Sequence, residues 1–157
     1  MAKTGRADLA DLHRLIPDSE KVAELKLLTR DQDALVQMQT RLINQLTACL
    51  KAYYPVALEL FGKLHQKSTL LFLQTYPTPA AAASASLSQI LQMLEQTKHP
   101  QARKVASHIA EQLSQPQLQA APATTRAKSR LLQALVSQLL PLIEQIAQYD
   151  KEIRTLF

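Results

Sequence analysis

Over two long stretches of the chain, apolar residues recur at steps of three and four that alternate, closely in the first stretch and strictly in the second. The first stretch, residues 19–54, follows Pro17, and either Asp18 or Ser19 can cap its start. Its apolar seam consists of Val22, Leu25, Leu28, Leu35, Leu42, Leu46, Cys49 and Tyr53. Gln32 and Gln39 interrupt the seam, and Val36 and Ile43 broaden it at those points. The pattern predicts one long amphipathic helix that ends before Pro55.

The second stretch, residues 125–157, repeats the pattern more strictly. Its seam consists of Leu132, Leu135, Leu139, Leu142, Ile146, Tyr149, Ile153 and Leu156. Pro141 should kink this helix, because proline removes a backbone donor and crowds the preceding turn. Each long helix needs a partner for its seam, and the two are similar in length. We therefore expect an antiparallel coiled-coil hairpin, formed within one chain or between copies.

Turn and capping residues divide the intervening region, residues 55–122, into short helices. The expected helices are 55–61, 68–76 capped by Ser68, one beginning at Thr78 and Pro79, 87–97 capped by Ser86, and 100–113, followed by a connector over 114–125. This region should form a compact helical head on the two long helices.

Composition agrees with an all-α fold in one folding unit. The chain has 157 residues, two glycines and 4% aromatic residues, and it is rich in Leu, Ala and Gln. The first residues lack the apolar core of a secretory signal, and no stretch is apolar enough to span a membrane. The single cysteine, Cys49, excludes an intramolecular disulfide and fits a reducing cytoplasm. We expect a cytoplasmic protein without a membrane partner.

The formal net charge of +5 is concentrated in the middle of the chain. The cations responsible are Lys98, Arg103, Lys104, Arg126, Lys128 and Arg130. Such a zone attracts phosphate backbones, although a simply soluble surface accounts for it equally well. We predict that this zone binds DNA or RNA in a salt-sensitive way, and that the binding weakens when Arg103, Lys104, Arg126 and Lys128 become Ala or Gln. No aromatic residues interleave the cations, so the sequence carries no base-stacking signature.

No motif in the sequence predicts a catalytic centre. The histidines (His13, His65, His99 and His108) lack metal-ligand spacing, and there is no nucleophile elbow or phosphate loop. We therefore assign no catalytic residue and expect no metal or other cofactor for this chain.

Several segments together resemble the DEDD-type, RuvC-like transposases of insertion sequences one-ten, one-sixteen and nine-oh-two, relatives of the Piv DNA invertase. They are Lys3-Thr4-Gly5-Arg6-Ala7-Asp8, the run 39–46, Tyr54-Pro55 with Phe61, Leu71-Phe72-Leu73 with Tyr76-Pro77-Thr78-Pro79, and Gln145-Ile146 with Asp150, Ile153 and Leu156. The resemblance implies a nuclease domain with four acidic ligands for a divalent metal such as Mg²⁺, a coiled-coil middle domain and a domain with a serine nucleophile. Residues 1–17 would be the end of the nuclease domain, and residues 18–157 the coiled-coil domain.

The resemblance also bears on catalysis. Asp8 matches the last acidic ligand of the family, whereas Gly5 stands where the preceding acid is expected. Metal-dependent phosphodiester chemistry needs several converging carboxylates. We therefore expect Asp8 to be a vestigial ligand and this chain alone, as the middle segment of a longer transposase, not to catalyse transposition.

By the resemblance, the chain should form a homodimer through its coiled coil and contact DNA and a guide RNA. The interface residues would be Leu28, Leu35, Leu42, Leu46, Leu132, Leu135, Leu139, Leu142, Ile146, Tyr149 and Ile153. Arg41 and Asn44 would join the six cations as candidates for nucleic-acid contact, although packing or solvent also explains them. Two alternatives remain open: a stand-alone helical interaction module or small regulator, and an intact enzyme.

Overall fold

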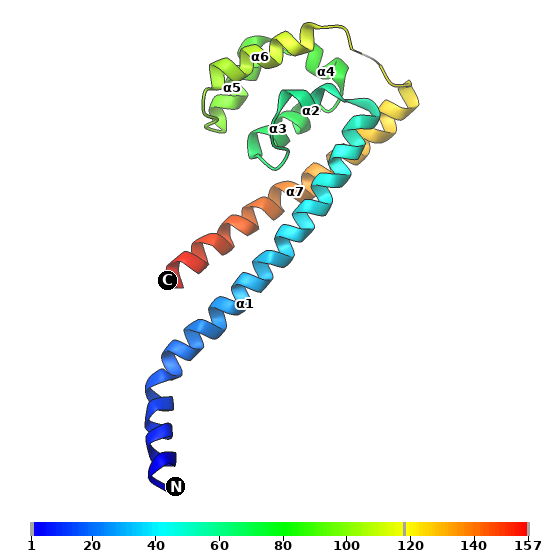
Figure 1. Ribbon diagram of the computed structural model, residues 1–157. Helices are drawn as coiled ribbons and strands as arrows, with labels where there is room; N and C mark the ends of the chain where they lie inside the picture. The colour runs from blue at the N-terminus through cyan, green and yellow to red at the C-terminus, as the bar shows by residue number, and fades with distance from the viewer. Residues whose placement is uncertain (1, 118, 157) are drawn as a thin grey trace. The chain divides into compact units, whose positions relative to one another are not determined.

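The computed structural model describes the backbone of residues 2–117 and 119–156, and the side chains of residues 19–117 and 119–156. Every regular element in these ranges is a helix, so the all-α prediction is confirmed (Figure 1). The helices are α1 (Ala2–Tyr53), α2 (Val56–Leu60), α3 (Lys67–Thr75), α4 (Pro79–Ala83), α5 (Leu87–Gln96), α6 (Ala102–Ser114) and α7 (Pro122–Leu156). Among the described residues, none of these helices combines the length and apolar content that a membrane crossing requires.

Both long helices begin earlier than the sequence pattern predicts. Helix α1 begins at Ala2 rather than residue 19, because Pro17 removes only one hydrogen bond and the helix continues across it. Helix α7 begins at Pro122 rather than residue 125, since proline suits the first position of a helix, where its missing N–H has no partner to lose. It then continues through Pro141 to Leu156.

The chain divides into two compact units, each built from separate stretches of sequence. One unit comprises residues 38–143, which include the end of α1, all the short helices and the first part of α7. The other comprises residues 1–37 and 144–157. We call them the head unit and the stalk unit and describe each by itself.

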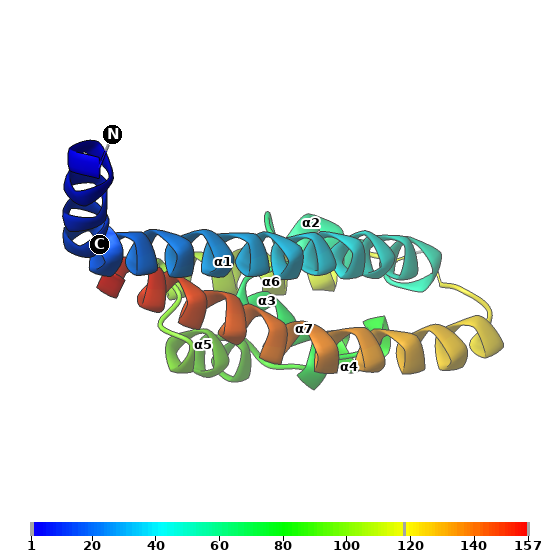
Figure 2. The ribbon, with the colours of Figure 1, turned by 90° about the horizontal axis from the view of Figure 1, so that it is seen from below.

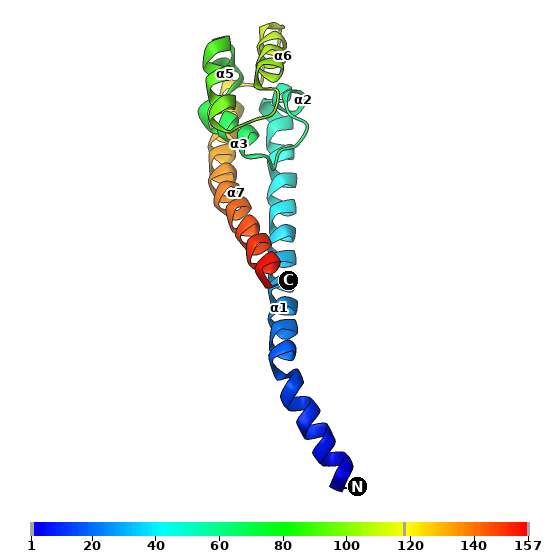
Figure 3. The ribbon, with the colours of Figure 1, turned by 90° about the vertical axis from the view of Figure 1, so that its left-hand side faces the viewer.

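In the head unit, the short helices gather where α1 ends and α7 begins (Figure 1). Helix α6 is the centre of this group, because α5, α2 and α4 all pack against it, while α3 packs against α5. Seen from two further directions, α2 and α6 lie on the side of α1, and α5 lies on the side of α7 (Figures 2 and 3). The two parts of α1 and α7 in this unit run in opposite directions.

The hydrophobic core lies entirely in the head unit, as far as side chains are described. Its largest fully buried members come from five helices and the Tyr53–Tyr54 corner: Leu46, Leu50, Tyr53, Tyr54, Leu70, Phe72, Leu73, Ile90, Leu94, Ile109, Leu132 and Leu139. Of the seam residues predicted on α7, Leu132, Leu135 and Leu139 therefore lie in this core, and Leu142 is half-buried. Phe72 joins two ring contacts, to Phe61 and to Tyr76, each with ring centres 5.1 Å apart.

Three side-chain hydrogen bonds fasten loops and helices of the head unit to one another. The Tyr53 hydroxyl of α1 donates to the carbonyl of Pro77 (2.6 Å), and burial raises the pKa of this phenol. The fully buried Thr69 of α3 donates to the carbonyl of Lys63 (3.0 Å). The Cys49 thiol of α1 donates to the carbonyl of Lys128 on α7 (3.2 Å). These bonds connect segments that are distant in sequence.

The capping predictions have mixed outcomes. Thr78 accepts from the Ala81 N–H, and Ser86 and Gln89 form a reciprocal capping box, so both predicted caps are confirmed. The cap assigned to Ser68 is wrong, because α3 starts one residue earlier and its N-cap is Gln66. Ser68 lies inside the first turn and is buried, where its hydroxyl cannot flank the helix.

The turn between α5 and α6 contains two non-glycine residues in the left-handed region, Lys98 (φ 55°) and Gln101 (φ 57°). Lys98 donates its N–H to the carbonyl of Glu95, and His99 donates to that of Leu94, the pattern of a Schellman motif. Gln101 is the N-cap of α6, which is why α6 starts at Ala102 rather than at Pro100 as predicted. Left-handed backbone is unfavourable for residues with a Cβ, so this turn stores strain.

Replacing Lys98 with glycine should therefore stabilise the head unit. Glycine adopts the left-handed conformation without steric cost, and we expect the free energy of unfolding to rise by about 0.5–1 kcal/mol. Lys104→Gly is the matched control, since Lys104 lies within α6, where glycine costs about 1 kcal/mol. Urea unfolding of both variants checks the prediction, and equal losses in the two would contradict it.

The stalk unit contains an apolar seam whose side chains are less buried than those of the head-unit core. Leu25, Leu28 and Leu35 of α1 are half-buried, as are the seam residues of α7, which are Ile146, Tyr149, Ile153 and Leu156. Gln32 does not simply weaken this seam: its side-chain amide donates to the carboxylate of Asp150 (2.5 Å) and to the carbonyl of Ile146 (3.3 Å). No described side chain of this unit is fully buried.

Apolar side chains also remain exposed on α1 in the stalk unit. Val22, which the pattern places on the seam, is 49% exposed, and Leu27 is 60% exposed. Val22 departs from the prediction because it lies six residues before Leu28, whereas the other seam residues follow a repeat of seven. The stalk unit therefore presents apolar surface on either side of its seam.

Candidate nucleic-acid interface

The first turns of α7 carry three of the predicted cations, which differ in their surroundings. Arg126 and Arg130 are exposed and lie four residues apart, on one face of the helix. Lys128 is half-buried, and its charge lies near the buried Cys49 thiol. Burial raises the pKa of that thiol, and Lys128 opposes the shift only in part. Arg126 and Arg130 are thus better placed than Lys128 to meet a ligand.

The start of α6 and the turn before it carry the other three predicted cations. Arg103 and Lys104 are exposed in the first turn of α6, and Lys98 is exposed in the left-handed turn. The first turns of both α6 and α7 contain no acidic residue. Because a helix N-terminus carries a partial positive charge, these cations add to a potential of the same sign. Both helix starts are therefore attractive to anions.

A cavity of about 290 Å³ adds one cation, Lys63, that sequence reasoning did not single out. It brings Lys63 and Gln66, from the loop between α2 and α3, next to His99 and Val105 at the start of α6. Lys63 lies outside the basic stretch recognised by composition, and His99 was set aside for lack of metal-ligand spacing. The sequence feature that could have identified them is their position in polar loops, with Lys63 next to Gly62 and His99 next to Pro100.

Arg41 and Asn44 are exposed on α1, and neither lines a described cavity. Arg41 and Asn44 therefore share no described cavity with the other candidates. Throughout the head unit, as far as it is described, no lysine or arginine forms an ion pair with an aspartate or glutamate of the same ranges. Residues 38–143 contain ten lysines and arginines but only three acids, Glu59, Glu95 and Glu111, so this unit has a net positive charge.

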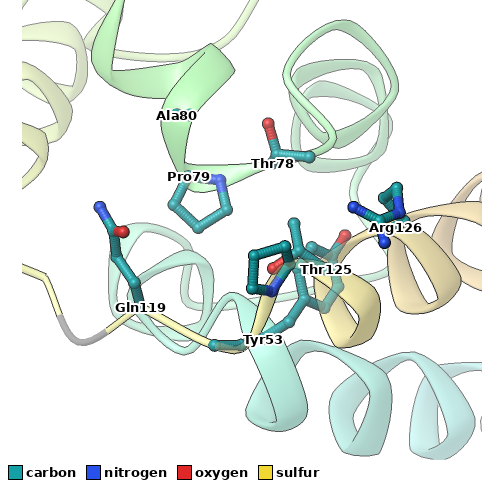
Figure 4. A pocket seen from close by; sticks show the side chains of 9 residues that line it. Tyr53, Thr78, Pro79, Ala80, Gln119, Thr125 and Arg126 are labelled. Atoms are coloured by element: carbon teal, nitrogen blue, oxygen red, sulfur yellow. The ribbon is translucent and has the colours of Figure 1, made fainter.

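A second cavity, of about 310 Å³, lies where α1 ends and α7 begins (Figure 4). Its lining comes from three distant segments: Tyr53, Thr78, Pro79, Ala80, Gln119, Ala120, Pro122, Thr125 and Arg126. Most of its surface is apolar. The guanidinium of Arg126 stands at one side of the hollow and the Gln119 amide at the other (Figure 4). Among the predicted candidates, only Arg126 lines this cavity.

Among the described side chains, no group of three or more His, Cys, Asp or Glu residues is placed to hold a metal ion. Asp8 and Gly5, the two positions matched to the family's acidic ligands, lie outside the residues whose side chains are described.

The sequence itself matches known proteins of transposable elements. Residues 1–55 match a DEDD-type family named after IS110 and described as transposase. Over 152 residues, 97% of this chain, it is 33% identical to an uncharacterized 44.8 kDa protein of insertion element IS116 from Streptomyces clavuligerus. The chain is similar to the IS110/IS116 family of insertion-sequence transposases. The resemblance inferred from the sequence is thereby confirmed.

The match extends to a further member of the family. The mini-circle protein assigned as the transposase for IS117 in Streptomyces coelicolor is 36% identical over 83 residues, half of this chain. The chain spans 37% of the length of the IS116 protein, and its match covers 20% of the IS117 protein. No solved structure matches the chain. The IS110/IS116 similarity thus reaches beyond α1 into the head unit.

Proposed function

We propose that this chain supplies the part of an IS110/IS116 transposase that self-associates and contacts nucleic acid, without carrying the catalytic centre. The observation that carries the proposal is the pair of cationic helix starts in the head unit. Arg103 and Lys104 on α6 and Arg126 and Arg130 on α7 are exposed, and neither first turn contains an acid. Such a surface favours a polyanion, and in this family the polyanion would be DNA or a structured RNA.

The stalk unit supports the self-association half of the proposal. Its seam residues are only half-buried, and Val22 and Leu27 expose apolar surface beside the seam. A second copy, packed as a coiled coil on these side chains, would remove that surface from water. Divalent-metal chemistry would belong to acidic ligands elsewhere in the full-length family protein.

The salt dependence of binding tests the nucleic-acid half. Fluorescence anisotropy with a labelled 20-base-pair duplex should give an association constant that falls steeply as salt increases. In the variant Arg103→Gln, Lys104→Gln, Arg126→Gln, Arg130→Gln, the slope of log K against log salt should decrease by about 0.9 for each phosphate that the altered side chains no longer neutralise. Arg130 is included and Lys128 is left out, because Arg130 is exposed and Lys128 is half-buried.

A control with the same change of charge separates local contacts from overall attraction. Lys21→Gln, Lys26→Gln, Lys151→Gln, Arg154→Gln removes four exposed cations of the stalk unit instead. We expect its slope to stay close to that of the unaltered protein. Equal slopes for all three proteins, or binding that does not respond to salt, would contradict the proposal.

A further inference from the structure

The cavity at the junction of α1, α4 and α7 has flat, apolar walls. Two proline rings, Pro79 and Pro122, line it together with Tyr53, Ala80 and Ala120. The Tyr53 hydroxyl is occupied by its hydrogen bond to the Pro77 carbonyl, so Tyr53 contributes its ring to the cavity rather than a free donor. Figure 4 shows the proline ring of Pro79 facing the hollow from α4. Its walls suit a planar group that leaves water on binding.

Four polar side chains stand around these apolar walls: Thr78, Gln119, Thr125 and Arg126. The Thr78 oxygen already accepts from the Ala81 N–H, which leaves its O–H available to donate. No hydrogen bond occupies the side chains of Gln119 or Thr125 within the part of the chain that the structure describes. An amide and two hydroxyls can donate and accept, as the edge of a heterocyclic base requires.

Charge around the cavity favours an anionic ligand. Arg126 is exposed and lines the cavity. It forms no ion pair with an acid of the described ranges. None of the residues that line the cavity is acidic. Arg130 lies four residues after Arg126, on the same face of α7 and further from the cavity. A ligand with a planar apolar part and an adjoining negative charge would fit this site. Its planar part would contact the apolar walls, and its negative charge would contact the Arg126 guanidinium.

We propose that this cavity binds a single unstacked nucleobase of a single-stranded nucleic-acid segment, whose backbone phosphates follow Arg126 and Arg130. A nucleotide combines a flat ring, a polar edge and a phosphate in the arrangement that the cavity offers. A volume of about 310 Å³ is large enough for one base. This inference rests on the proposed nucleic-acid function and adds to it a place where bases, not only phosphates, are recognised.

Two oligonucleotides of equal length and charge distinguish base binding from phosphate binding. One is a labelled 12-residue oligothymidine, and the other has the same backbone with every base replaced by an abasic spacer. The full chain should bind the oligothymidine about tenfold more tightly, the effect expected for packing one base against a protein surface. Both should show salt-dependent binding through their phosphates.

A cavity-filling variant with a matched control assigns the difference to this site. Ala80 is exposed and lines the cavity, so Ala80→Trp should fill it without disturbing the core. Ala83 is exposed on the same short helix but does not line the cavity, so Ala83→Trp adds the same side chain elsewhere. In Ala80→Trp the tenfold preference should disappear while binding of the abasic strand is unchanged. Ala83→Trp should keep the preference.

The possible outcomes separate this inference from the proposed function. Equal binding of the two strands by the unaltered protein, or a preference that survives in Ala80→Trp, would overturn the base site and leave the phosphate surface intact. Failure to bind either strand or the duplex at low salt would overturn the proposed function itself. Circular dichroism of both tryptophan variants verifies that they remain folded.

Discussion

Replacing Leu132 with alanine is expected to lower the free energy of unfolding by about 2–5 kcal/mol. Leu132 lies on α7, its side chain is completely buried, and it belongs to the core shared by α1, α7 and the short helices. Alanine removes the apolar packing of three carbon atoms and leaves a cavity that close-packed neighbours fill only in part. Urea unfolding followed by circular dichroism measures the decrease.

The neighbouring Leu131 provides the control for this prediction. It has the same side chain on the same helix, but it is 40% exposed. Leu131→Ala should cost no more than about 1 kcal/mol, because less apolar surface returns to water. Similar decreases in the two variants would show that α7 does not pack through the face that contains Leu132.

Self-association of the chain should be abolished by placing charges on the exposed apolar residues of the stalk unit. In Val22→Asp, Leu27→Asp, each of two associating copies no longer buries two apolar side chains, worth roughly 1.5 kcal/mol each, and must instead desolvate two carboxylates. We therefore expect the dimer dissociation constant to rise by about 1,000-fold or more. Light scattering across a concentration series measures the molar mass.

The double variant Ala23→Asp, Gln37→Asp adds the same charge to α1, at exposed positions on the side away from the seam. It should associate like the unaltered chain. A molar mass equal to one chain at every concentration of the unaltered protein would refute self-association directly. A loss of association in both double variants would point to net charge instead of the apolar surface.

The long helices and several caps could be predicted because their signals are local. A repeat of three and four places Leu132 and Leu139 on one face of a helix in any tertiary setting, and Thr78 and Ser86 cap through groups three residues away. The left-handed turn at Lys98 and Gln101 carries no such signal, because neither residue is a glycine. Packing of α5 on α6 overrides that local preference.

The sequence was enough to predict which cations form the candidate interface, but not how they are arranged in space. The excess of cations identified Arg103, Lys104, Arg126 and Arg130, all of which are exposed. It could not identify the cavity beside Arg126, because residues 53, 78–80 and 119–126 meet only through the fold. For the same reason it included Lys128, whose half-burial beside Cys49 depends on the packing of α1 against α7.

Pro141 has a mechanical consequence for α7, since it lies two residues before the last residue of the head unit. Proline has no N–H, so the carbonyl of Ser137, four residues earlier, lacks its usual helical partner. Helix–coil transitions propagate from one hydrogen bond to the next, and a missing bond interrupts that propagation. The last turns of α7 can therefore melt and re-form as a separate cooperative segment while Leu132 and Leu139 keep the first turns in place.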